Sequence, residues 1–146
     1  MFVTNGRTVW NPVAGLTLPA SAFVSRIQVN PNNPNQVVVA VQGATSEGRV
    51  WVSNDGATHW ADITRDLPDG LQVYTVAADW RFSNLTLYVG TDRAVYASGL
   101  KAWGWRRFGE GLPSTLVSDL EITPGRVITA AAYGRGAFQL RLPDHE

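Results

Sequence analysis

The sequence predicts an all-β protein in which a unit of short antiparallel strands occurs three times. The first observation is the period, because Trp60 and Trp105 lie 45 residues apart, and so do Ser53 and Ser98. The second is composition: short segments rich in Val, Ile, Thr and aromatic residues alternate with clusters of Pro and Gly. The third is that no stretch keeps a helical periodicity over more than a turn or two. Four strands per repeat of this length are typical of a propeller blade.

We name the four expected strands of each blade A to D, from the propeller axis outward. Two complete blades are expected at about residues 25–64 and 74–108, and strands A to C of a third at about 117–142. The missing outer strand D is expected near the start of the chain, at about residues 8–14. The chain is therefore expected to be a single propeller domain, residues 1–146, that is partial or self-assembling.

The N-terminal strand is assigned from its likeness to the later outer strands. Trp10 leads into a Leu-Pro pair, as Trp60 and Trp105 do. Tryptophans recur at strand positions and are expected in the core: Trp10, Trp51, Trp60 and Trp105.

Three blades are too few to close a propeller, because closed rings need about four or more. A free arc of three blades would expose an apolar face at each end. Two chains related by a two-fold axis would give six blades, with residues 8–14 completing a blade in their own chain or in the partner. We therefore expect a homodimer, and a fragment of a longer propeller is the alternative.

Residues 53–60 read Ser-Asn-Asp-Gly-Ala-Thr-His-Trp, and their Asn-Asp-Gly is strong turn chemistry. The order and spacing resemble the Asp-box (BNR) repeat of sialidase-like, sortilin-like and xyloglucanase-like β-propellers. The matching positions are Ser53, Asp55, Gly56, Thr58 and Trp60. The resemblance implies a structural hairpin, and we expect Asp55 to be buried and bonded within it. A second copy starting at Ser98 keeps the Ser and the Trp but loses the Asp, Gly and Thr.

In propellers the B–C and D–A loops share one face, where ligands usually bind. Five residues are expected on this rim: Arg49, Asp92, Arg93, Tyr133 and Arg135. Arginine forks and a tyrosine hydroxyl suit the recognition of a carboxylate or a sugar. The alternative is that the three arginines, which hold equivalent positions in the repeats, form structural ladders between blades. Trp80 and Trp103 are expected either to stack on a sugar or to pack between blades.

Patterns for catalysis and metal binding are thin. His59 is the only internal histidine, so a His-ligated metal site or a His-based triad has no second member. There is no cysteine, which excludes disulfides and thiolate chemistry. No cofactor is expected.

Carboxylates for glycoside cleavage could be drawn from a set of which no pair stands out by spacing: Glu47, Asp66, Asp69, Asp79, Asp92, Glu110, Asp119 and Glu121. The Phe/Tyr-Arg-Ile-Pro element of sialidases is absent. The sequence therefore favours a non-catalytic scaffold or binding module for a glycan or protein. A fragment or half-ring of a glycoside hydrolase is the alternative.

Charge and hydropathy exclude other partners. Twelve basic residues balance twelve acidic ones without runs, so there is no electrostatic case for nucleic acid or an anionic membrane. No apolar stretch approaches the roughly 20 residues of a membrane span, and no signal peptide is expected at the N-terminus. The family resemblance would imply a secreted or periplasmic protein, and the sequence itself leaves the location open.

Overall fold

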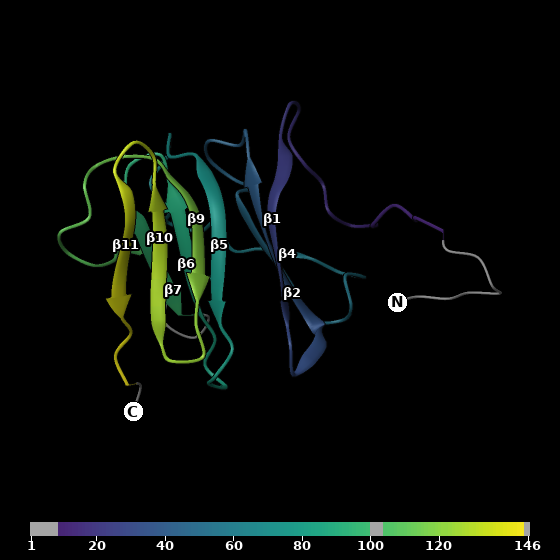
Figure 1. Ribbon diagram of the computed structural model, residues 1–146. Coiled ribbons are helices and arrows are strands. Elements are labelled where there is room, and N and C mark those ends of the chain that lie inside the picture. The colour runs from purple at the N-terminus through teal and green to yellow at the C-terminus, as the bar shows by residue number, and fades with distance from the viewer. Residues whose placement is uncertain (1–8, 100–103, 145–146) are drawn as a thin grey trace.

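The computed structural model describes residues 9–99 and 104–144. Within them it contains eleven β-strands and no helix (Figure 1), which confirms the all-β prediction. No helix in this part of the chain is long and apolar enough to cross a membrane. The strands form three separate antiparallel sheets.

The first sheet has four strands in chain order: β1 (Phe23–Asn30), β2 (Asn33–Gln42), β3 (Val50–Ser53) and β4 (Ala61–Asp62). The second sheet repeats this order with β5 (Val73–Asp79), β6 (Thr86–Thr91), β7 (Val95–Gly99) and β8 (Arg106–Arg107). The third sheet has three strands: β9 (Val117–Ile122), β10 (Val127–Ala132) and β11 (Gly136–Arg141). The three expected repeats therefore coincide with three sheets.

The sheets pack face to face, which explains the apolar runs in their middle strands. Val38 and Ala40 of β2 lie in a core shared with the second sheet, whereas Val39 and Val41 belong to a cluster on the opposite face. A strand that is covered on both faces reads as a continuous apolar run. The second core contains Tyr88 of β6 together with residues of the third sheet.

The first strands of the three sheets lie side by side, with β5 between β1 and β9 (Figure 1). Gly90 on β6 allows the second and third sheets to approach closely. A Cβ atom at this position would lie 2.7 Å from Cγ2 of Thr75 and 2.8 Å from the carbonyl oxygen of Val117, so a larger residue would have to push β9 away.

The strand expected at about residues 8–14 is not formed within this chain. Residue 8 lies outside the described residues, and residues 9–14 form no strand. A strand needs a partner edge, and the free edge of β11 lies on the far side of the molecule from this segment (Figure 1). Trp10 is 95% exposed, so its expected place in the core is wrong for this chain by itself, whereas Trp105 is buried. Trp51 and Trp60 are half-buried.

Candidate functional site

The loops expected to share one face are joined to one another by hydrogen bonds. In the β2–β3 loop, the carbonyl oxygen of Thr45 accepts a hydrogen bond from the amide of Gly70 over 2.8 Å. The β6–β7 turn exchanges bonds with the β4–β5 connection, since the amide of Asp92 donates to the carbonyl of Gln72 and the amide of Gln72 donates to the carboxylate of Asp92. On the third sheet, the amide of Tyr133 donates to the carbonyl of Leu116. We call this surface the loop face.

Arg49 is fully buried, and its guanidinium donates only to backbone. The acceptors are the carbonyl oxygens of Ser46, Leu67, Pro68 and Leu71, at 2.6 to 3.0 Å. Three of these carbonyls belong to the connection between the first two sheets, so Arg49 fastens one sheet to the next. Burial lowers the pKa of Arg49 from its ordinary value, against the opposing charges of Asp69 and Asp62. This geometry supports the ladder alternative for Arg49.

The other four rim residues reach the surface in two pairs. The Arg93 side chain is 71% exposed, and its Nε lies 4.0 Å from the carboxylate of Asp92. Tyr133, which is 74% exposed, and the exposed Arg135 lie in the turn between β10 and β11. Within the described residues no hydrogen bond or ion pair joins the two pairs. The structure therefore presents their cationic and hydroxyl groups on the loop face but does not bring them into one cluster.

A second polar group lies where β1, β5 and β9 meet, and we call it the first-strand cluster: Arg26, Thr75, Asp119 and Glu121. Arg26 of β1 pairs with Asp119 of β9 at 3.1 Å and also contacts the carboxylate of Glu121. The hydroxyl of Thr75 donates to Asp119 over 3.2 Å.

The sequence analysis placed Asp119 and Glu121 among eight acidic residues without singling them out, and it missed Arg26. Repeat alignment could have found the cluster, because Arg26, Thr75 and Asp119 hold the same position in their three repeats. Both carboxylates contact one guanidinium, so the cation already occupies the space between them. No group of three or more acidic or histidine side chains in residues 9–99 and 104–144 could hold a metal ion.

The hairpin at residues 53–60 is bonded internally, as predicted. Oδ1 of Asp55 accepts from the hydroxyl of Ser53 and from the amides of Thr58 and His59, at 2.9 to 3.1 Å. Its Oδ2 lies 2.6 Å from Nδ1 of His59. The bonds from the His59 amide and ring, followed by that from Ser53, lower the pKa of Asp55 from 3.8 to about 2. Gly56 supplies the turn with a φ of +69°.

The predicted burial of Asp55 is wrong, because 44% of its side chain is exposed. The carboxylate is bonded by residues of the hairpin itself, and the turn is also tied to β2, because the amide of Gly56 donates to the carbonyl of Asn35. Trp80 is half-buried and packs against the core between the first two sheets, which favours the packing alternative. Trp103 lies outside the described residues.

Comparison with models of known protein families finds no match, and neither does comparison with curated protein sequences.

Proposed function

We propose that the chain is a non-catalytic propeller module, related to the Asp-box β-propellers, whose loop face binds a glycan or a protein. Each sheet is one blade in this proposal, and the ring is closed by another copy to give six blades. The observation that carries it is the contact between Arg26 and Asp119. Contact between side chains at equivalent positions of the first and third sheets is expected if the sheets fan out from a common axis, as blades do.

The loop face is favoured as the binding surface because of what it exposes. Arg93 and Arg135 present planar donors, and Tyr133 presents a ring with a hydroxyl group. Such groups recognise carboxylates and sugars. Arg49 contributes by holding the loops in place rather than by contact with a ligand.

A glycan array probed with the purified protein tests the binding role. Alanine at Arg93, Tyr133 or Arg135 should weaken the binding of a captured glycan by about tenfold or more. Alanine at Arg106 or Arg107 is the matched control, since these exposed arginines lie on β8, at the outer edge of the second sheet. Equal losses in the control variants would overturn the assignment of the loop face.

The hydrolase alternative rests on one observation, the adjacent carboxylates of Asp119 and Glu121. Glycosidases use a pair of carboxylates for catalysis, and the two groups must leave room for a sugar between them. A screen of aryl glycosides decides between the two functions. Turnover that disappears in both Asp119→Asn and Glu121→Gln would establish hydrolysis and end the non-catalytic proposal.

A further inference from the structure

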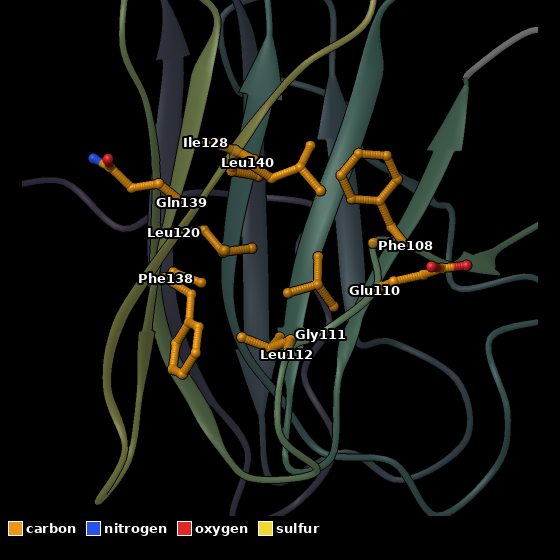
Figure 2. Close-up of a pocket in the computed structure, with 12 residues that line it drawn as sticks. Phe108, Glu110, Gly111, Leu112, Leu120, Ile128, Phe138, Gln139 and Leu140 are labelled. Carbon is orange, nitrogen blue, oxygen red and sulfur yellow. The ribbon is translucent and has the colours of Figure 1, made fainter.

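An apolar groove opens at the outer end of the third sheet, and we call it the outer groove. Figure 2 shows Leu120, Ile128, Phe138 and Leu140 of the third sheet on one side and Phe108 and Leu112 on the other. The side chains of Glu110 and Gln139 point away from it (Figure 2). Its volume is about 140 Å³, and an apolar cavity of roughly 150 Å³ can bind benzene. The outer groove thus fits a flat aromatic ring.

The corresponding place between the first and second sheets is filled by Trp105. This side chain is 6% exposed, and its Nε1 donates to the carbonyl of Ile63 over 3.0 Å. Ile63 and Leu67, in the same core as Trp105, hold the repeat positions of Phe108 and Leu112 in the groove. Trp105 belongs to the outermost part of the second sheet, and the third sheet has no fourth strand within the described residues. The groove is therefore the site of the third sheet's missing tryptophan.

Trp10 is the side chain that matches this site. It is 95% exposed, and the chain around it repeats the pattern of the outer strands that begin after Trp60 and Trp105. Its own copy cannot supply it, because the N-terminal segment extends beyond β1, on the side away from β11 (Figure 1). If Trp10 fills the outer groove, it must therefore come from a second copy.

The register of the existing outer strands fixes how this segment would pair. Trp51 lies opposite Asp62, and Tyr96 lies opposite Arg107. Transferred to the third sheet, this register sets Pro12 opposite Phe138, with Asn11 opposite Gln139 on β11.

Pro12 fits this register despite its missing N–H. The amide of Ile63 donates to the carbonyl of Val50, and the amide of Phe108 donates to that of Val95. Asp62 and Arg107 hold the position that corresponds to Pro12. In both sheets the hydrogen bond to the neighbouring strand is donated by the next residue, Ile63 or Phe108. In an antiparallel pair, alternate residues direct their amides away from the partner. A proline on an edge strand at such a position costs no ladder bond.

A second observation also supports this pairing, and it concerns the indole nitrogen of Trp60 in the copy that donates the N-terminal segment. Nε1 of Trp60 is buried and has no hydrogen-bond partner among the residues that the structure describes. The equivalent atom, Nε1 of Trp105, donates a hydrogen bond to the carbonyl of Ile63, which is three residues after Trp60. Three residues after Trp10 is Val13. When residues 9–14 pair on β11 of the second copy, the carbonyl of Val13 should lie near Trp60 of its own chain. This arrangement would match that of the Ile63 carbonyl and Trp105.

We infer that two copies exchange their N-terminal segments, each adding residues 9–14 to β11 of the other and inserting Trp10 into its outer groove. This inference rests on the proposed propeller architecture. A buried aromatic side chain contributes about 150–250 Å². Trp10 alone therefore supplies a substantial share of the ~800 Å² per partner that a standard interface needs. Further exposed apolar surface lies on the N-terminal segment, at Val9 and Val13, and on β1, at Phe23, Ile27 and Val29.

Sedimentation of the full chain and its Trp10 variants tests the inserted side chain. The wild type should sediment as a dimer of twice 15.9 kDa. Trp10→Ala should raise the dissociation constant about 100-fold or more, and its thermal unfolding as a monomer should match that of wild-type monomer, because Trp10 is exposed there. Trp10→Phe keeps a flat ring and should remain within about tenfold of wild type. Equal dissociation constants for wild type and Trp10→Ala would overturn the insertion.

Disulfide trapping tests the strand exchange. The chain contains no cysteine, so only the introduced cysteines can form a disulfide. Asn11→Cys and Gln139→Cys chains carrying different tags should link on mild oxidation, because opposed residues lie about 5.5 Å apart. Asn11→Cys with Ala137→Cys is the register control, since an offset of two residues places the Cα atoms about 7–8 Å apart. A dimer in which positions 11 and 139 do not link would overturn the exchange but leave the propeller proposal standing. A native monomer at micromolar concentration would overturn both the exchange and the six-blade ring, without bearing on glycan binding.

Discussion

Arg26 and Asp119 form an ion pair at 3.1 Å although they lie on the first strands of the first and third sheets. The second sheet contributes Thr75, which also bonds Asp119. Three equivalent positions of the repeat thus meet at one point. Their side chains differ in charge and in size, which makes them complementary rather than repetitive.

Removing Arg26 should cost more than a surface ion pair does. The Asp119 and Glu121 side chains are 46% and 60% exposed, so each pair alone is worth no more than about 1 kcal/mol. Arg26→Ala also leaves the two carboxylates facing each other. We expect the free energy of unfolding to fall by about 1–2 kcal/mol in urea titrations. A second substitution, Glu121→Gln, should recover part of the loss; a further drop would contradict the role given to Arg26.

Arg49 should be among the most sensitive positions in the chain. Arg49→Met keeps much of the apolar stem but leaves the carbonyls of Ser46, Leu67, Pro68 and Leu71 without their donor. We expect the free energy of unfolding to fall by about 3–5 kcal/mol. Arg93→Met, at an exposed arginine in the equivalent loop, should change it by less than about 0.5 kcal/mol. Similar values for the two variants would refute the structural role of Arg49.

Asp55 should make the hairpin sensitive to acid. Its pKa in the folded protein is about 2, below the ordinary 3.8, so its stabilising contribution is complete above pH 3.8 and is lost as the pH falls through about 2. The melting temperature of Asp55→Asn should therefore be lower than that of wild type near neutral pH. The difference should shrink as the pH is lowered from about 4 to about 2. A difference that is independent of pH over this range would show that the charge of Asp55 is not involved.

Tyr88 should respond at the alkaline end. It is 1% exposed, and burial, followed by the charge of Asp79, raises its pKa from 10.0 to about 12. The folded protein therefore favours the neutral phenol, and stability should fall as the pH rises from about 10 through about 12. Spectrophotometric titration should resolve a late-titrating tyrosine in the wild type that is absent in Tyr88→Phe. Titration of all tyrosines near pH 10 in the folded protein would contradict this environment.

The strands were predictable because their signals are local. Alternation, β-branched residues and Gly or Pro turns place the three expected units, at about residues 25–64, 74–108 and 117–142, within a few residues of the three observed sheets. The internal bonds of the hairpin were also predictable, since Asp55 accepts only from residues within four positions of it. Its exposure was not, because burial depends on what covers a hairpin, and nothing in residues 53–60 encodes that.

The sites that depend on packing were harder to predict. The expected equivalence of Arg49 with Arg93 and Arg135 is wrong. The strand register places Arg49 directly before its strand, where the other repeats have Ala94 and Gly136. Arg26 escaped prediction because its repeat equivalents, Thr75 and Asp119, share no chemistry with it. Trp10 was assigned to an outer strand by likeness to Trp60 and Trp105, but the edge that such a strand requires does not lie within reach in the same copy.

Gly90 lies where the second and third sheets approach each other closely, next to Thr75 and Val117. The missing side chain lets β9 pack closely against β6, and a Cβ atom here would press on the carbonyl of Val117 and so alter how the third sheet inclines toward the second. In a closed ring that inclination, repeated from sheet to sheet, must sum to one full turn, and its value determines how many sheets complete the circle. A methyl group at residue 90 would change this angle at two of the six junctions of the proposed dimer. The ends of the arc would then miss each other, and the same contacts that close a ring would propagate as an open spiral.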